Sequence, residues 1–307
     1  MPRPSTFSIV ARDPEQNAVG VGVQSKFVSV GAVVPFVSAD AGAVATQSYA
    51  NVAYGPDGLD LLRSGRPAEE VVMELTGADP EFESRQVGVV GQDGSVAAFT
   101  GADCFDYAGD IQGENYSVQG NILENRETLE AMAETFEEAS GGLPERLIAA
   151  LHAGNEAGGD KRGEQSAALS VAKPEGGYDG RNDRWIDVRV DDHERPIDEL
   201  ERVFKIYDVT LLEREEPDET RELSGETAIE VGAALVELGF FDGTPDETFG
   251  EEERDALEDF RGMNNFENHS LAVLEDALVR GWDDTEGDGE GRMVDAIWHG
   301  LSRLERK

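Results

Sequence analysis

The 307-residue sequence has one cysteine, few basic residues and no long apolar run. Cys104 has no second cysteine with which to form an intrachain disulfide, which fits a reducing compartment. No window approaches the ~18 consecutive apolar residues that span a bilayer, and the opening MPRPSTFSIV lacks the apolar stretch of a signal peptide. We therefore expect a cytoplasmic protein that does not enter a membrane.

The shortage of basic residues restricts the partners. The chain carries 26 Lys and Arg against 65 Asp and Glu, a net charge of -39. Nucleic acids and anionic membrane surfaces are bound through clusters of Lys and Arg, so this composition argues against both as partners. Val, Ala, Leu and Ile nevertheless recur in patterned runs, so we interpret the charge as the acidic surface of a folded, halophile-type protein.

The apolar periodicity predicts strands and helices in separate groups. Alternating runs predict strands within 6–13, 19–28, 30–47, 85–101, 165–172 and 183–192. Helical spacing predicts two helices within 55–80 and one in each of 124–139, 142–159 and 197–215. This grouping favours an α+β fold with antiparallel sheets. The helices suffice to cover two sheets, as in a four-layer αββα sandwich, although a two-layer fold fits the same periodicity.

A dense acidic segment with Pro217, EREEPDETRELSGE, indicates a domain boundary near residue 216. We expect one domain over 1–215 and a second over 216–307. Residues 227–268 show a helical pattern, a glycine-containing turn and a second helical pattern, which predicts a small all-α domain.

Thr6 opens the first predicted strand, and a catalytic hypothesis depends on it. An amide hydrolase can use a threonine hydroxyl as nucleophile when that threonine is the first residue of the mature chain. Its own α-amine, whose unperturbed pKa is about 8, then serves as the base, and no histidine is needed. The alternative is structural, because β-branched threonine commonly begins strands.

Two further residues are candidates for catalysis. Lys26, one of only five lysines, follows a valine-rich run, where its charge could stabilise the nucleophile's amine or an oxyanion. The alternative is a solvated lysine at a strand edge. Asn121 follows a glycine in VQGNIL, which we interpret as a strand-to-helix region, and its amide could line the site or cap a helix.

Other polar residues of the same segments are candidates for substrate binding. They are Ser25, Thr46, Gln47, Asn51, Asp160, Arg162 and Gln165. Hydroxyls and amides can donate hydrogen bonds to a substrate carbonyl, and a glycine-rich loop such as GGDKRGEQS can present an arginine to a substrate carboxylate. Ordinary loop capping, or a local pair between Asp160 and Arg162, is the alternative.

Asp191, Asp192 and His193 carry groups that can bind a divalent metal ion. Adjacent strand residues point to opposite faces, so the three cannot bind one ion without a turn. Capping of the following helix is the alternative. We expect no metal and no cofactor.

Seven segments carry a resemblance that covers residues 6–212. They are TFSIVARDPE, GVGVQSKFVSVGAVVPF, GAVATQSYANVAYGPDGLDLL, RQVGVV, VQGNIL, GGDKRGEQSAAL and IDVRVDDHERPIDEL. In this order they resemble a widespread prokaryotic family, the domain of unknown function family 1028. The resemblance implies an N-terminal-nucleophile (Ntn) hydrolase fold and a mature chain that begins at Thr6. It also implies hydrolysis of an amide bond, without naming a substrate.

A second resemblance lies in LVELGFFDGTPDETFGEEERDALEDFRGMNNFEN. This run is similar to peptidoglycan-binding-like domains, in which a leucine-containing helix, an LGF turn and a DxxFG signal recur. A docking or dimerisation role for this domain is the alternative, and it leaves a homo-oligomer open.

The sequence departs from the family pattern because MPRPS precedes Thr6, and removal of Met1 alone would expose Pro2. Cleavage after Ser5, or a start codon nearer to Thr6, would restore the mechanism. Two hypotheses follow: an Ntn-type hydrolase of a small amide or peptide-like substrate, and a non-catalytic protein that binds a small metabolite on the same scaffold.

Overall fold

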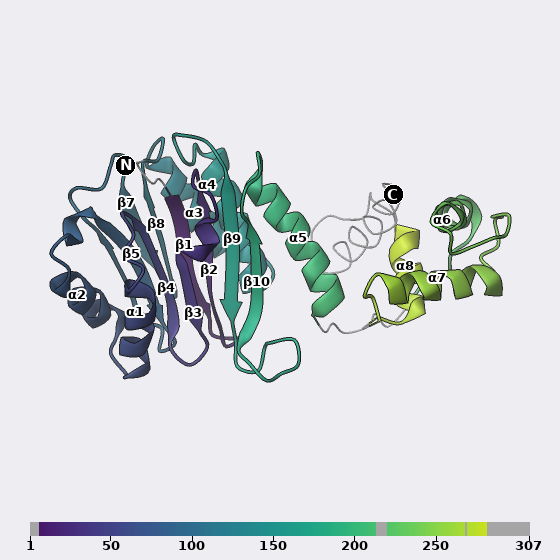
Figure 1. The fold of residues 1–307 in the computed structure, drawn as a ribbon, viewed down its shortest axis with the longest axis horizontal. Coiled ribbons are helices and arrows are strands. Elements are labelled where there is room, and N and C mark those ends of the chain that lie inside the picture. The colour runs from purple at the N-terminus through teal and green to yellow at the C-terminus, as the bar shows by residue number, and fades with distance from the viewer. Residues whose placement is uncertain (1–5, 213–219, 268, 281–307) are drawn as a thin grey trace. The chain divides into compact units, whose positions relative to one another are not determined.

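The computed structural model describes residues 6–212, 220–267 and 269–280. Contacts divide the chain into two compact units, Met1–Glu201 and Arg202–Lys307, and the division falls within helix α5 (Pro196–Leu211). Figure 1 shows the strands gathered in the first unit and short helices in the second. None of the helices in the described ranges is long and apolar enough to cross a membrane.

A six-stranded antiparallel sheet contains the first strand of the chain. Its strand order is β10-β9-β2-β1-β8-β7. The strands are β1 (Thr6–Asp13), β2 (Ala18–Ser25), β7 (Gly109–Gly113), β8 (Tyr116–Asn121), β9 (Ser166–Ala172) and β10 (Arg184–Val190). Every residue of β2, β8 and β9 is buried, which explains why these strands lack polar positions that face solvent.

A four-stranded antiparallel sheet has the order β3-β4-β5-β6. The strands are β3 (Pro35–Ser38), β4 (Gly42–Ser48), β5 (Arg85–Gly91) and β6 (Val96–Thr100). The strands predicted within 6–13 and 85–101 are confirmed. The second arm of the first hairpin was predicted to reach residue 28 but ends at Ser25, and Val30–Ala32 form a short 3₁₀ helix, η1, before β3.

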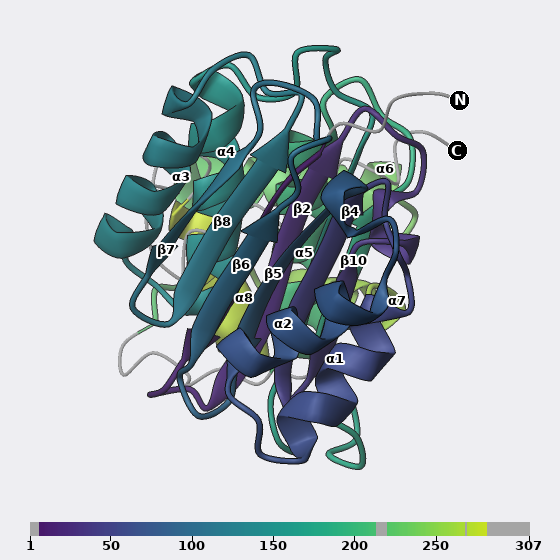
Figure 2. The same ribbon diagram turned by 90° about the vertical axis from the view of Figure 1, so that its left-hand side faces the viewer.

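The two sheets face each other, and pairs of helices cover their outer faces (Figure 2). Helices α1 (Tyr54–Arg63) and α2 (Ala68–Ala78) pack on the four-stranded sheet, while α3 (Glu127–Glu138) and α4 (Leu143–Glu156) pack on the six-stranded sheet. Amphipathic spacing explains this docking, because the apolar stripe of each helix is its buried side. The predicted α+β fold with antiparallel sheets is confirmed.

The hairpin formed by β7 and β8 was not predicted from the sequence. Its turn contains Asn115, which adopts the left-handed backbone conformation at φ 64°. The interpretation of VQGNIL as a strand-to-helix region was therefore incomplete, because Asn121 is the last residue of β8. Strand β8 alternates apolar and polar side chains, but its polar ones, Ser117, Gln119 and Asn121, are fully buried where such a pattern predicts exposure to solvent.

The second unit is helical. It contains α6 (Gly225–Glu237), α7 (Glu251–Met263) and α8 (Leu271–Arg280) around a core that includes Leu235, Phe249, Phe260 and Leu274. The helix, turn and helix predicted over 227–268 are confirmed, whereas α8 was not predicted. The rest of the predicted domain, beyond residue 280, lies outside the described residues.

Candidate functional site

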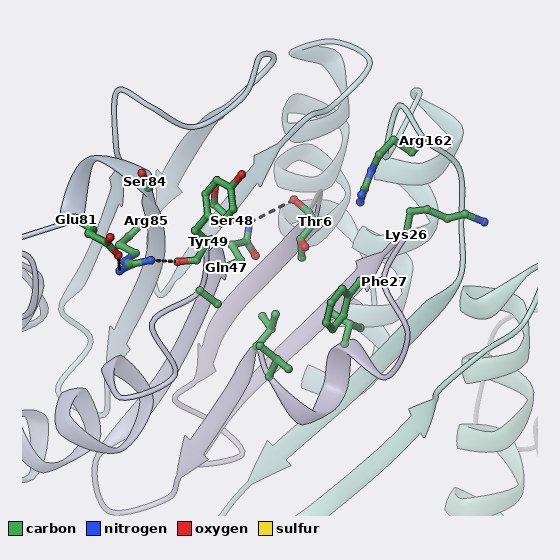
Figure 3. A pocket seen from close by; sticks show the side chains of 14 residues that line it. Thr6, Lys26, Phe27, Gln47, Ser48, Tyr49, Glu81, Ser84, Arg85 and Arg162 are labelled. Carbon is green, nitrogen blue, oxygen red and sulfur yellow. Dashed lines mark hydrogen bonds and ion pairs between the residues drawn. The ribbon is translucent and has the colours of Figure 1, made fainter. Parts of the chain in front are cut away.

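A pocket of about 840 Å³ lies at the start of β1. Figure 3 shows the side chains that line it. They are Thr6, Lys26, Phe27, Val30, Val33, Val34, Gln47, Ser48, Tyr49, Ala50, Glu81, Ser84, Arg85 and Arg162. The volume suits a small-molecule ligand, because ligand pockets in proteins commonly span about 300–1,000 Å³.

Thr6 is the first residue of β1, and only 3 % of its surface is exposed. Its Oγ1 lies 3.1 Å from the Oγ of Ser25 at the end of the neighbouring β2. Its carbonyl oxygen accepts a hydrogen bond from Gln47 Nε2 at 3.3 Å, and it pairs across the sheet with Asn121. Three strands from two sheets therefore hold Thr6 at the edge of the pocket.

A row of buried amides and hydroxyls, the inter-sheet amide network, connects the two sheets beside the pocket. It consists of Ser8, Gln47, Gln86, Gln119 and Asn121, each at most 1 % exposed. The Ser8 hydroxyl donates to Gln47 Oε1 at 2.6 Å and accepts from Gln119 Nε2 at 2.7 Å. Gln86 Oε1 accepts from Gln47 Nε2 at 2.8 Å and from Asn121 Nδ2 at 3.0 Å. Each amide is thereby oriented by its neighbours.

The network needs a glycine on the opposing strand. A Cβ atom at Gly88 in β5 would lie 2.1 Å from Gln119 Oε1, a separation that no side chain can adopt. Glycine at this position therefore makes room for Gln119 between the sheets.

Arg85 forms one side of the pocket, where α2 leads into β5. Its Nε donates to Asp79 Oδ2 at 2.9 Å, its Nη2 to Glu81 Oε2 at 2.7 Å, and its Nη1 to the carbonyl oxygen of Tyr49 at 2.6 Å. The Arg85 hydrogen bond holds the pKa of the buried Asp79 carboxyl well below its usual range, against the opposing effect of burial. This side is a fixed ion-pair cluster.

The opposite side of the pocket is built around the buried carboxylate of Asp160. Asp160 Oδ2 accepts the backbone N–H of Lys26 at 2.8 Å and lies 3.1 Å from Arg162 Nη2. Asp160 Oδ1 accepts the backbone N–H of Arg162 at 2.9 Å. The Arg162 side chain is 29 % exposed, whereas the Asp160 side chain is completely buried. Asp160 therefore fixes both the turn after β2 and the arginine above Thr6.

The apolar wall of the pocket comes from the segment that follows β2. Val30 and Val34 are at most 3 % exposed, and the backbone N–H of Val30 donates to Ser166 Oγ at 3.1 Å. A Cβ atom at Gly31 would lie 2.6 Å from the Ala168 Cβ, so glycine lets this segment approach β9 closely. The wall is therefore held against the six-stranded sheet.

Residues 6–200 match the family model described as "Family of unknown function (DUF1028)". The chain belongs to this family. Residues 210–298 match a second model, described as "Putative peptidoglycan binding domain". A solved DUF1028 protein, SPO2555 from Silicibacter pomeroyi, is 32% identical with a TM-score of 0.61, and the match covers 66% of this chain and 89% of that chain. No curated protein matches the chain.

The DUF1028 domain brings several of the sequence-predicted residues to the pocket. Thr6, Lys26, Gln47 and Arg162 line it. Ser25, Asn121 and Asp160 do not line it but contact Thr6, Gln86 and Arg162, respectively. Residues far apart in the sequence are thus neighbours in the fold.

Lys26 does not direct its charge at Thr6. The Lys26 ammonium donates to the carbonyl oxygen of Glu164 at 2.8 Å, and Figure 3 shows its side chain running away from Thr6. The expected support of the nucleophile or an oxyanion by Lys26 is therefore absent from this arrangement. The reason is that β2 ends at Ser25, so Lys26 begins an exposed turn.

Thr46, Asn51 and Gln165 do not line the pocket of the DUF1028 domain. Thr46 pairs with Val87, whose side chain packs under α1 and α2, so Thr46 lies on the helix-covered face of its sheet. Asn51 donates to the carboxylate of Asp79 at 3.0 Å. Gln165 donates to Asp192 at 3.0 Å on the exposed surface. Substrate binding by these three residues receives no support from their positions.

Asp191, Asp192 and His193 follow β10 as exposed residues. Asp192 accepts the Gln165 hydrogen bond, and His193 Nδ1 lies 2.9 Å from the carbonyl oxygen of Arg195. Within the described ranges, no three His, Cys, Asp or Glu side chains form a group that could hold a metal ion. The three residues therefore do not form the metal site that was considered for them.

Sequence reasoning missed Arg85, Glu81 and Tyr49. Asp79 and Arg85 flank a single 3₁₀ turn between α2 and β5, and this short spacing was the available signal for an ion pair. Among the 14 described residues that line the pocket, none is histidine or cysteine, and the carboxylate of Glu81 is paired with Arg85. No side chain in this set is placed as a general base for the Thr6 hydroxyl.

Proposed function

We propose that the DUF1028 domain is an N-terminal-nucleophile hydrolase that cleaves an amide bond of a small or peptide-like molecule, with Thr6 as nucleophile. The observation that carries the proposal is the place of Thr6, at the start of β1, at the edge of the pocket and beside Ser25. The order of helix pair, sheet, sheet and helix pair supports it, because a four-layer αββα sandwich is the architecture of Ntn hydrolases.

The chemistry requires a free α-amine on Thr6. The amine accepts the proton of the Thr6 hydroxyl as Oγ1 attacks the amide carbon, and it returns that proton to the leaving nitrogen as the C–N bond breaks. The resulting ester on Oγ1 is then hydrolysed by water. Gln47, which donates to the Thr6 carbonyl oxygen, would hold the nucleophile's backbone in place during both steps.

Residues 1–5 lie outside the described residues, and their removal is part of the proposal. The test is the intact mass of the protein purified from its native host, together with a variant that lacks residues 2–5, so that removal of Met1 exposes Thr6. We expect this variant to release amine from a panel of N-acyl amino acids and dipeptides, and its Thr6→Ala form to release none. Retention of residues 1–5 in the active native protein would overturn the mechanism.

A non-catalytic binding role on the same scaffold is the second candidate. The encoded MPRPS favours it, because in the uncut chain the nitrogen of Thr6 belongs to a peptide bond and cannot act as a base. Saturable binding of a small amide by the uncut chain, without turnover in either form, would select this role over hydrolysis.

The match over residues 210–298 supports a separate proposal for the helical unit, that it binds peptidoglycan. Cosedimentation of the full chain with purified murein is the test. Binding would support a peptidoglycan-binding role and argue against the cytoplasmic expectation, whereas recovery of the chain in the supernatant would favour a docking or dimerisation role.

A further inference from the structure

The pocket has a different charge balance from the rest of the molecule. The chain carries 65 acidic against 26 basic residues. Among the residues that line the pocket, three are basic (Lys26, Arg85 and Arg162) and one is acidic (Glu81). A net charge of -39 repels anions from the surface at large, so an anionic ligand needs a cationic side chain directed into its pocket.

The carboxylates paired with these basic side chains offset their charge to different extents on the two sides of the pocket. Arg85 is bonded to two carboxylates, Asp79 and Glu81, so its cluster has a net charge of about −1. On the opposite side, Arg162 is paired with the single carboxylate of Asp160, so that pair has a net charge of about zero, and the Lys26 ammonium lies at the carbonyl oxygen of Glu164. An anionic group of a ligand therefore meets less repulsion beside Arg162 than beside Arg85.

The guanidinium of Arg162 is also oriented to bind an anionic group of a ligand. Two of its guanidinium nitrogens, Nε and Nη2, face Asp160 at 3.3 and 3.1 Å, which fixes the plane of the group. Figure 3 shows the guanidinium directed toward the part of the pocket that holds Thr6, on the side away from Arg85. A planar guanidinium held in this way matches a carboxylate better than a mobile ammonium does.

The remaining wall of the pocket is apolar. Phe27, Val30, Val33, Val34 and Ala50 line it without contributing a side-chain hydrogen-bonding group. Phe27 is 36 % exposed, so an apolar ligand group would shield it from water. The segment is anchored by the bond from the Val30 backbone to Ser166, so the wall is already formed.

We propose that the ligand of this pocket is an amide that joins an aliphatic acyl chain to a carboxylate-bearing group, in chemical class an N-acyl amino acid. Arg162 binds the carboxylate, the valine-rich wall binds the acyl chain, and the amide between them lies at Thr6. This assignment rests on the proposed function for its reaction, but its binding claim is independent of turnover.

The test measures binding to the full chain carrying Thr6→Ala, so that the probes remain intact. Isothermal titration at one fixed salt concentration compares N-hexanoylglycine with its uncharged analogue, N-hexanoylglycinamide. We expect the carboxylate to bind at least about tenfold more tightly, since hydrogen bonds between charged groups contribute roughly 1.5–3 kcal/mol. Extending the acyl chain by two methylenes is expected to tighten binding about tenfold, from ~0.8 kcal/mol for each buried methylene.

Arg162→Gln is expected to abolish the preference for the carboxylate and to keep the dependence on acyl length. Arg184→Gln is the matched control, because it removes the same charge from an exposed arginine of β10 that does not line the pocket. It is expected to retain the preference. Arg162→Lys, which keeps the charge without the planar fork, is expected to retain only part of it.

Equal binding of the two glycine derivatives by the parent chain would overturn the inference, as would an unchanged preference in Arg162→Gln. If Arg162→Gln does not fold, the comparison of charged with uncharged probes in the parent chain still tests whether the pocket prefers a carboxylate. Selective binding without turnover in the chain that begins at Thr6 would refute the hydrolase proposal and leave this inference standing. Turnover without preference for a carboxylate would refute this inference and leave the hydrolase proposal standing.

Discussion

The Ser8→Ala substitution provides a sharp test of the inter-sheet amide network, because it removes one oxygen atom and creates almost no cavity. The Ser8 hydroxyl donates to Gln47 Oε1 at 2.6 Å and accepts from Gln119 Nε2 at 2.7 Å. All three side chains are at most 1 % exposed, so water does not replace the missing hydroxyl. Two buried polar atoms would therefore lose their short hydrogen bonds.

The expected cost follows from those two atoms. A buried polar group that loses its partner costs about 1–3 kcal/mol, and Gln119 Nε2 keeps a longer contact with the Ser8 carbonyl oxygen at 3.3 Å. We therefore expect Ser8→Ala to lower the free energy of unfolding by about 2–4 kcal/mol. For a unit of roughly 200 residues this corresponds to a fall in Tm of about 4–16 °C.

Urea denaturation at one fixed salt concentration, with the denaturant slope compared between variants, is the appropriate assay. Ser170→Ala is the matched control, because Ser170 is a buried serine of β9 that lies outside the network. We expect it to change the free energy of unfolding by about 1 kcal/mol or less. Equal stability of the two variants would refute the claim that the network holds the sheets together.

Two further predictions concern pH. Asp79→Asn is expected to destabilise the protein by about 3 kcal/mol at pH 7, because it breaks a buried ion pair with Arg85. Since the folded pKa of Asp79 is depressed, its contribution is present above the unfolded pKa of about 3.9 and is lost as the pH falls, so wild type and variant should converge in acid urea titrations. His152 has a raised pKa, first because of its hydrogen bond with Glu201 and also because Asp198 and Glu156 are near. Its contribution is complete below the unfolded pKa of about 6.5 and disappears as the pH rises through the folded pKa, so denaturation between pH 6 and pH 9 should show a loss of stability that His152→Gln lacks.

The sequence was most informative where one face of an element is apolar. Strand β1, the hairpin of β5 and β6, and helices α1 to α4 follow from their periodicity. Strand β8 also alternates, but its polar side, Ser117, Gln119 and Asn121, is buried, which an alternating pattern does not predict. The partners of the Gln119 and Asn121 amides lie on β1 and β5, so no local pattern could reveal that these buried amides would be paired.

The residues of the candidate site were also only partly predictable from the sequence. Thr46 and Gln47 were both assigned to substrate binding, yet adjacent residues of a strand face opposite sides, so only one of them can face a given pocket. The alternation of side chains along a strand therefore rules out one of the two residues as a pocket residue. The packing of Val87, the partner of Thr46, under the helices shows that Thr46 is the one that faces away. Arg85 was missed because its role depends on the distant Tyr49 carbonyl as well as on nearby acids.

The side chains between the two sheets change from apolar to polar toward the pocket, and the polar ones position Thr6. Along β1 the inward residues run from Val10 through Ser8 to Thr6, and along β4 they run from Ala45 to Gln47. The apolar half contributes burial without specific pairs, whereas each buried amide needs its own hydrogen-bond partner, so a displacement of one sheet against the other leaves polar groups unpaired. Catalytic groups must be held to within about 0.5 Å by packing and hydrogen bonds, and Gln47, itself bonded to Gln86, provides such a hydrogen bond to Thr6. In the chain that begins at Thr6, Ser8→Ala should therefore lower kcat more than it raises KM, because the damage falls on the placement of the nucleophile and not on the walls that bind the substrate.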